Sequence, residues 1–416
     1  MKFIHAADIH LDSPLHGLAN YPDAPADQLR GASRDAFVQL VDRAIDESID
    51  FMVIAGDLYD GDWRDYNTGI FFVREMGRLK RAGIPVFVLF GNHDAENEMT
   101  RRLTLPDNVF TFDSRKPQTH RLDELQVALH GQSFKVKAVT ENLVHAYGNP
   151  VPGYYNIGVL HTALEGNAAH ANYAPCSRAE LHAKGYDYWA LGHVHEFQHW
   201  NEQSQIVFPG NLQGRHIREV GRRGAVLVGV DGGQTSIERL YLDVLRWELL
   251  LVDVTQCDTM SDVARRIGQD LTQLLEDDGH VPRAVRVVVT GQSPAHGALF
   301  GKAADLRAEV LGQIAGIGND RLWLEKVKVR TEPVAVATGA GEASGAIADL
   351  KEILDEAATS PEFIAQLKGE LQTFLGRLPA EVSEDVPLVN LARQGDFAAL
   401  VEHVAPALMA TLTRDE

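Results

Sequence analysis

The chain has 416 residues, of which 45% are hydrophobic and 23% charged, and a formal net charge of −19 at pH 7. This length exceeds one ordinary hydrophobic core and predicts two or three domains of a globular protein. Charged residues, glycines and prolines interrupt every apolar stretch, and no signal-peptide pattern opens the sequence, so we expect no membrane partner. Only Cys176 and Cys257 occur, which argues against a disulfide framework and predicts a cytoplasmic protein.

The acidic charge argues against a protein that grips nucleic acid through a broad basic face. Residues 334–416 hold fourteen acidic and five basic side chains, so they account for −9 of the −19. The rest of the chain can still carry a local basic patch or bound divalent cations, which net charge does not count.

Short apolar strands alternate with helical stretches up to about residue 244. The expected strands are 2–8, 51–57, 85–91, 126–131, 155–161, 186–193, 206–210, 225–231 and 236–243, and the expected helices are 35–48 and 68–82. The last two strands form an antiparallel pair joined by Gly232 and Gly233. This alternation is typical of an α/β layered domain, which we place at residues 1–245.

A smaller α+β domain is expected at residues 246–332, in the order strand, helix, strand, helix, strand. After Pro333, the stretch TGAGEASGA predicts a flexible linker. Amphipathic helices are expected at 347–358, 361–378 and 388–409. We interpret residues 333–416 as a linker and a helical partner-binding region. The alternative is that these helices form a small bundle or pair with a second copy.

Five polar motifs stand at or just after the ends of predicted strands. They are Asp8-Ile9-His10, Gly56-Asp57, Gly91-Asn92-His93-Asp94, His161 and Gly192-His193-Val194-His195. A single such aspartate or histidine is more often a helix cap, a turn residue or a hydrogen-bonded surface group. Five of them in this order indicate one site, because sites in layered α/β folds assemble at the carboxyl ends of strands.

The motifs supply ligands for two divalent ions, which we assign as Asp8, His10 and His195 for one ion, Asn92, His161 and His193 for the other, and Asp57 as the bridge. Mixed imidazole, carboxylate and amide ligands suit Mn²⁺, Fe²⁺ or Zn²⁺. Two such ions can generate a hydroxide and clamp the phosphoryl oxygens of an in-line displacement. We assign the neighbouring His93 to the substrate, as a general acid or a stabiliser of transition-state charge. The glycines at 56, 91 and 192 are expected to allow tight backbone turns.

Arginines near the motifs are candidates for phosphate contact. Arg215, Arg218, Arg222 and Arg223 cluster after the last metal motif, and Arg101 and Arg102 follow the GNHD motif. Solvated surface charge is the alternative interpretation for both sets. Trp63 and Tyr66 beside Arg64 have the chemistry to stack on an unpaired base, although core packing is the simpler explanation for Trp63.

Together, DxH, GD, GNHD, a single histidine after a strand and GHVH form the signature of the calcineurin-like metallophosphoesterases, over residues 1 to about 215. The stretches IHAADIHLDSPL, AGDLYDGDWRDYNTG and LGHVHEFQ resemble the YhaO branch of the SbcD-type DNA repair exonucleases. The resemblance implies a layered β-sandwich flanked by helices, followed by a capping domain. It also implies manganese-dependent cleavage of double-stranded DNA by a homodimer that works with an SMC-like ATPase of the YhaN or SbcC type.

One position departs from this family pattern. Several relatives carry a histidine three residues after the bridging aspartate, where this chain has Asp60. Asp60 either orients His93 or weakens one mode of nuclease action.

We therefore predict a two-metal phosphodiesterase, a DNA repair exonuclease in which a metal-bound hydroxide attacks phosphorus. Two alternatives stay open. A nucleotide or cyclic-nucleotide phosphodiesterase fits the acidic charge. A regulatory subunit that tethers the ATPase would use the metal site for structure only.

Overall fold

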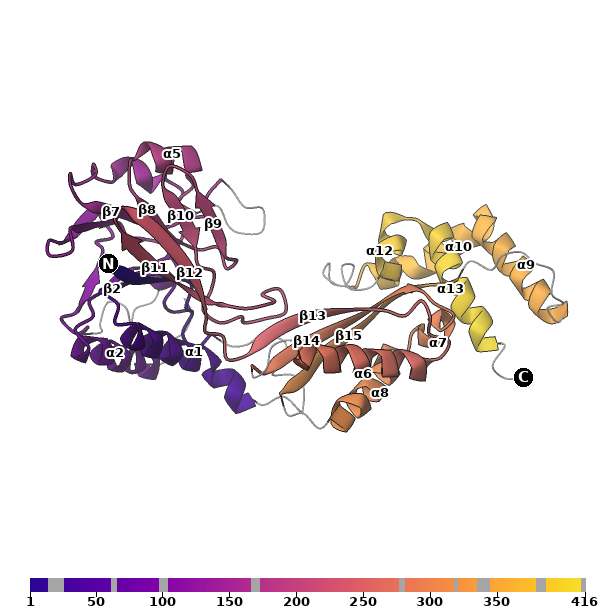
Figure 1. Cartoon of the computed structure of the whole chain (residues 1–416). Coiled ribbons are helices and arrows are strands. Elements are labelled where there is room, and N and C mark those ends of the chain that lie inside the picture. The colour runs from indigo at the N-terminus through magenta and orange to yellow at the C-terminus, as the bar shows by residue number, and fades with distance from the viewer. Residues whose placement is uncertain are drawn as a thin grey trace. The chain divides into compact units, whose positions relative to one another are not determined.

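The computed structural model describes residues 1–13, 26–60, 66–96, 104–165, 173–276, 281–317, 321–334, 345–378 and 387–412. The chain divides into two compact units (Figure 1). One unit comprises Met1–Glu248 with His280–Val285, and the other comprises Leu249–Gly279 with Arg286–Glu416. None of the described helices combines the length and the apolar character needed to cross a membrane.

The first sheet of the first unit has the strand order β12-β11-β1-β2-β3-β4. Its strands are β1 (Lys2–Ala6), β2 (Phe51–Ala55), β3 (Val86–Leu89), β4 (Val109–Thr111), β11 (Gly224–Asp231) and β12 (Gln234–Tyr241). Strands β1 to β4 run parallel, and β11 pairs antiparallel with both β1 and β12. The parallel strands therefore end at a common edge.

The second sheet has the strand order β5-β6-β7-β8-β10-β9. Its strands are β5 (Gln118–Leu122), β6 (Val127–Gly131), β7 (Tyr155–His161), β8 (Tyr188–Gly192), β9 (Gln198–Asn201) and β10 (Gln205–Phe208). The four central strands are parallel and the two edge strands pair antiparallel. The short edge strands β5 and β9, like β4 of the first sheet, were not predicted from the sequence.

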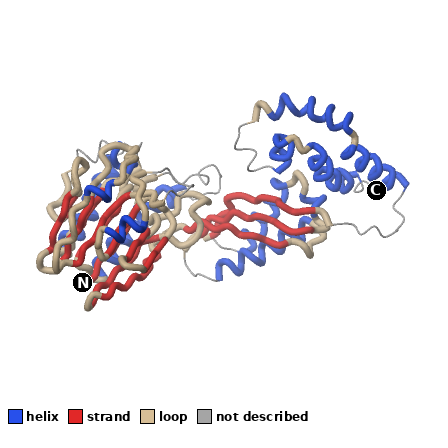
Figure 2. Tube along the Cα trace, turned by 90° about the horizontal axis from the view of Figure 1, so that it is seen from above, coloured by secondary structure: helices blue, strands red, loops and turns tan. Residues whose placement is uncertain are grey.

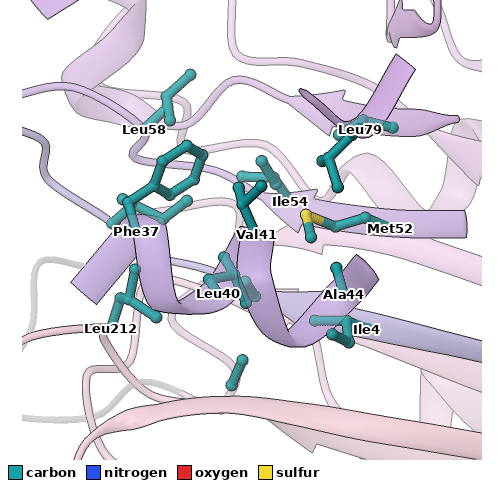
Figure 3. Close-up of a cluster of buried hydrophobic side chains, with 14 of the residues drawn as sticks. Ile4, Phe37, Leu40, Val41, Ala44, Met52, Ile54, Leu58, Leu79 and Leu212 are labelled. Atoms are coloured by element: carbon teal, nitrogen blue, oxygen red, sulfur yellow. The ribbon is translucent and has the colours of Figure 1, made fainter. Parts of the chain in front are cut away.

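Alternate residues of the first sheet face two different cores, as the two-residue period of a strand requires. Phe3 and Phe51 stack with ring centroids 4.8 Å apart in the core between the two sheets. Figure 2 shows the strands of the first unit in red. Ile4 faces the opposite core, against α1 (Ala26–Asp46) and α2 (Tyr66–Arg81) (Figure 3). A third core covers the outer face of the second sheet, with η1 (Leu143–Ala146) and α5 (Arg178–Ala183). The fold is thus α/β, a β-sandwich flanked by helices, as predicted.

The second unit contains a three-stranded sheet in the order β13-β14-β15. Its elements are β13 (Arg246–Asp253), α6 (Met260–Glu276), β14 (Arg283–Gln292), α7 (His296–Leu299), α8 (Ala303–Ile317) and β15 (Leu322–Glu332). The buried face of α6 repeats at helical spacing, through Val263, Ile267 and Leu271. The strands and the two longer helices follow the predicted order, and the short helix α7 is an addition to it.

The C-terminal segment of this unit is helical. It forms α9 (Gly345–Thr359), α10 (Pro361–Leu375), α12 (Pro387–Gln394) and α13 (Phe397–Leu412). The apolar stripe of α10 packs against Phe397 and Leu400, so the helices form the small bundle given above as the alternative. The single helix predicted at 388–409 is wrong, because Gly395 adopts a φ of 81° and ends α12. The linker residues 335–344 lie outside the described residues.

Candidate metal centre

The five predicted motifs meet at one edge of the sandwich. The loops after β1 and β2 are joined there by backbone hydrogen bonds of 3.0 Å, from Asp8 N to Gly56 O and from His10 N to Asp57 O. The loop after β8 joins them, because the backbone N–H of His193 donates to both carboxylate oxygens of Asp8 at 3.0 and 2.9 Å. Residues up to 185 positions apart are thus fixed side by side.

Several of these residues adopt left-handed backbone conformations that non-glycine residues rarely take. The φ angle is 50° at Asp8, 46° at His10, 50° at Asp57 and 100° at His193. Such conformations persist only where the surrounding structure holds them, and they are concentrated at functional sites. The backbone of these loops therefore adopts conformations of higher energy, which orient the side chains toward one another.

Among the described residues, three groups of side chains have metal-ligand spacing, and one of them consists of His10, Asp60 and His93. The other two contain the predicted ligands, with Asp8, His10 and His195 in one and Asp57, His161 and His193 in the other. Asp57 lies between them, because its Oδ2 is 3.4 Å from His161 Nε2 and 4.0 Å from His10 Nε2. The remaining predicted ligand, Asn92, begins the short helix α3 (Asn92–Glu96), and its Oδ1 is 2.9 Å from His161 Nε2. All seven predicted ligands are brought together.

The geometry of these donors fits bound cations. His10 Nε2 and His195 Nε2 are 3.4 Å apart, a spacing that two nitrogen ligands of one ion, each about 2.0–2.1 Å from it, can adopt. The donors combine carboxylates, imidazoles and one amide, the set that suits borderline to hard divalent ions. No thiol is present among them, although Cys176 and Cys257 are both described and buried.

The electrostatics of the site also call for positive charge. Burial raises the pKa of Asp8, although His195 and His161 oppose the shift. Burial would raise the pKa of Asp57 too, but the charge and hydrogen bond of His161 outweigh it and hold that pKa below its ordinary range. In return, Asp57 overcomes the effect of burial on His161 and raises its pKa to about 9. Divalent ions would supply the same charge balance to these buried carboxylates.

His93 belongs to neither group of predicted ligands, although its ring lies within metal-ligand spacing of His10 and Asp60. Its backbone N–H donates to Asp57 Oδ1 at 3.0 Å, and its ring centroid is 5.0 Å from that of His10. Its Nδ1 is 3.0 Å from Asp60 Oδ1, while Asp60 Oδ2 accepts a hydrogen bond of 2.7 Å from Ser13 Oγ. The side chain of His93 is 34% exposed, whereas the ligands are almost completely buried apart from His195. Of the two roles left open for Asp60, this geometry favours the orientation of His93.

Asp94 is a positioning residue whose role was missed, although the GNHD motif contains it. Its buried carboxylate accepts backbone hydrogen bonds from Leu58, Tyr59 and Gly91 at 2.9–3.1 Å. Burial and the charge of Asp57 raise the pKa of Asp94 to about 7. Asp94 therefore ties the loop after β2 to the loop after β3.

The three motif glycines serve two different purposes. Gly56 has a φ of 97°, as a tight turn requires, and a Cβ there would also overlap the ring of His161. Gly91 and Gly192 do not have a positive φ, so no left-handed conformation requires glycine at these two positions. They leave room instead, because a Cβ at these positions would overlap the carboxylate of Asp57 and the carbonyl oxygen of Ala55, respectively.

The predicted arginine cluster divides on folding. Arg215 reaches the metal centre, where burial and next the charge of Arg215 lower the pKa of His10. Arg218 and Arg222 are exposed. Arg223 is buried and bonded internally, to Glu196 and to the carbonyl of Val220 at 2.7 Å, so phosphate contact by Arg223 is not supported. Tyr66 is 56% exposed at the start of α2, while Trp63, Arg64, Arg101 and Arg102 lie outside the described residues.

Comparison with known proteins agrees with this geometry. The family model for calcineurin-like phosphoesterases matches residues 1–197, and the model for the middle domain of the metallophosphoesterase YhaO matches residues 247–332. The chain therefore belongs to the calcineurin-like metallophosphoesterases.

Among its relatives, the uncharacterized metallophosphoesterase YhaO of Bacillus subtilis (strain 168) is 34% identical over 298 residues, covering 71% of this chain and 72% of YhaO. The DNA double-strand break repair protein Mre11 of Methanopyrus kandleri is 26% identical over 316 residues, covering 69% of this chain and 67% of that protein. A crystal structure of a dimetal phosphatase from Danio rerio is 11% identical, with a TM-score of 0.39, and covers 58% of this chain and 96% of that chain.

Proposed function

We propose that the protein is a DNA repair exonuclease that hydrolyses phosphodiesters with two bound divalent ions, Mn²⁺ in the cell. The observation that carries this proposal is the meeting of two metal-ligand groups at Asp57 with His93 beside them. One group would hold the first ion through Asp8, His10 and His195. Asn92, His161 and His193 would hold the second, and Asp57 would contact both. When bound, the two ions would lower the pKa of water and neutralise charge on the phosphoryl oxygens.

The chain's own residues supply the remaining chemistry. The Asp60 carboxylate can only accept, so it orients a protonated Nδ1 of His93, and the second ring nitrogen, Nε2, serves the substrate. His93 would then donate a proton to the departing oxygen. Arg215 has a buried Nε without a hydrogen-bond partner among the described residues, which suits a phosphoryl oxygen as its acceptor.

DNA is proposed as the substrate on two grounds. The first is that the Mre11 relatives carry the name DNA double-strand break repair protein. The second is that Arg218 and Arg222 present exposed positive charge a few residues from Arg215. Phosphate contacts of this kind position a duplex without reading its sequence. A homodimer and an SMC-like ATPase of the YhaN or SbcC type are the proposed assembly partners.

The test compares three substrates with the manganese-loaded protein, which are end-labelled linear duplex DNA, a chromogenic small diester and cyclic nucleotides. We expect nucleotides to be released from the duplex ends, with no activity in Asp57→Asn or in the presence of a chelator. Cleavage of the small diester or cyclic nucleotides with intact duplex would favour a nucleotide phosphodiesterase. Failure on all three substrates, with both ions bound, would favour the regulatory subunit.

A further inference from the structure

Glu219 is a buried carboxylate in the loop between β10 and β11, outside every motif that the sequence singled out. Its Oε1 is 2.7 Å from His195 Nδ1 and 3.2 Å from Arg215 Nη2. Its Oε2 accepts from the backbone N–H of Arg215 at 2.7 Å and from Asn211 Nδ2 at 3.0 Å. Three donors from Arg215 and Asn211, one of them a charged guanidinium, thus converge on two oxygens beside the His195 ring, an environment that favours an ionised carboxylate.

These contacts fix the tautomer of His195. A carboxylate cannot donate, so Nδ1 of His195 carries the proton that points at Glu219. The other ring nitrogen, Nε2, then presents its lone pair toward His10 Nε2 at 3.4 Å and Asp8 Oδ1 at 3.9 Å. A carboxylate behind a metal-ligating histidine orients the ring and raises its basicity.

The same carboxylate fixes Arg215 at two points, the backbone N–H and the guanidinium. Arg215 Nη2 and His195 Nδ1 lie 3.4 Å apart because both converge on Oε1. The side chain of Arg215 is only 15% exposed, and its Nε is the orphan donor described above. A change at the carboxylate therefore moves a metal ligand and a phosphate-binding group together.

We propose that Glu219 is a positioning residue that couples the ion held by Asp8, His10 and His195 to the phosphoryl oxygen held by Arg215. The inference rests on the proposed metal-dependent function and adds to it a residue that makes ion binding and phosphate binding depend on each other. A carboxylate that merely packs the loop would affect neither equilibrium selectively.

The test replaces Glu219 by glutamine, which keeps the shape but turns an NH₂ group toward donors. Glu202→Gln is the matched control, because Glu202 also accepts from a histidine and an arginine, His182 at 2.9 Å and Arg178 at 3.2 Å, outside both ligand groups. Titration with Mn²⁺ should show one of two ions weakened by about 10–100-fold in Glu219→Gln. The other ion of Glu219→Gln, and both ions of the control Glu202→Gln, should bind with the affinity measured in the unaltered chain.

Inorganic phosphate gives the second readout. Its affinity for the manganese-loaded protein should fall by about 10–100-fold in Arg215→Gln, the loss of one charged hydrogen bond. Phosphate should also increase the Mn²⁺ affinity of the site formed by Asp8, His10 and His195, and this increase should be smaller in Arg215→Gln than in the unaltered chain. This measurement needs no Glu219 variant, so it holds if Glu219→Gln does not fold. The inference is overturned if Glu219→Gln binds both ions normally or loses both equally, or if phosphate tightens the ion equally with and without Arg215.

These binding measurements require no cleavage of DNA. If Glu219→Gln loses one ion selectively while the unaltered, manganese-loaded chain shows no nuclease activity, the proposed function is overturned and the inference stands.

Discussion

His93 and Asp60 form a pair whose charges support each other. Burial lowers the pKa of His93, but the hydrogen bond that His93 donates to Asp60 and the charge of Asp57 outweigh it and raise that pKa above its ordinary value. A histidine held this way keeps a proton available for a leaving oxygen near neutral pH. Asp60 thus supplies a negative charge that raises the pKa of His93, which a neutral residue at this position would not do.

Replacing His93 by alanine tests its separation from the metal ligands. We expect near-normal metal content, because both ligand groups stay intact, and a fall in turnover of about 10²–10⁴-fold, the usual scale of general acid–base help. Elemental analysis and single-turnover kinetics on one preparation measure both quantities. A parallel loss of metal and activity would show that His93 is a ligand.

At the scale of elements, the long apolar strands and the main helices could be predicted because their patterns are local. Strands β4, β5 and β9 were missed, since each has only three to five residues and is mostly polar or half-exposed. The order of the strands within each sheet could not be predicted from local patterns either, because it depends on pairings such as His5 with Val226. The ligands were found because they end strands, whereas Glu219 lies in a loop with no such signal.

Gly192 tests how closely the two sheets must approach at the metal edge. A Cβ there would overlap the carbonyl oxygen of Ala55 in the other sheet, so Gly192→Ala should destabilise the fold by about 1–3 kcal/mol. It should also weaken metal binding, because His193 follows directly. Gly148→Ala is the control, since its Cβ would meet its nearest neighbour at 4.0 Å. Urea unfolding and metal content measure both effects, and equal behaviour of the two variants would refute the close-approach argument.

His5 of β1 makes stability depend on pH. It is buried between Tyr188 Oη and the carbonyl oxygen of Leu191, at 3.0 and 3.1 Å, and burial lowers its pKa from 6.5 to about 3. Below pH 6.5 the unfolded chain takes up a proton that folded His5 refuses, so stability falls as pH falls. Between pH 7 and pH 5 this amounts to about 2 kcal/mol. Urea unfolding in EDTA should show that loss in the unaltered chain beyond any in His5→Gln, and identical losses would contradict the assignment.

At the scale of the whole molecule, the predicted site lies within the first unit, while the acidic helices belong to the second. Part of the apolar stripes of these helices packs within their own bundle, where the apolar residues of α10 stay half-buried against Phe397 and Leu400. Phe363 and Phe374 of α10 nevertheless stay 42% and 56% exposed, and they lie eleven residues apart on nearly the same face. This exposed pair is where we expect a partner to bind, and not DNA, which the acidic side chains repel.

Deleting residues 340–416 should leave metal-dependent cleavage of a small diester unchanged and abolish co-purification with the SMC-like ATPase. Phe363→Ala with Phe374→Ala should have the same effect on the ATPase without breaking the bundle. Leu388→Ala serves as the comparison, because its side chain packs inside the bundle. If the truncated protein still binds the ATPase as tightly as the full chain, the segment is not the docking element, and residues 246–332 become the next region to test.

The most direct measurement of the central claim is the number of ions bound per chain. The protein is loaded with Mn²⁺, freed of excess metal and analysed for manganese, alongside Asp57→Asn. Because Asp57 lies between the two ligand groups, we predict two ions per unaltered chain and the loss of both in the variant. One ion or fewer in active protein, or an Asp57→Asn chain that keeps both, would contradict the two-metal account.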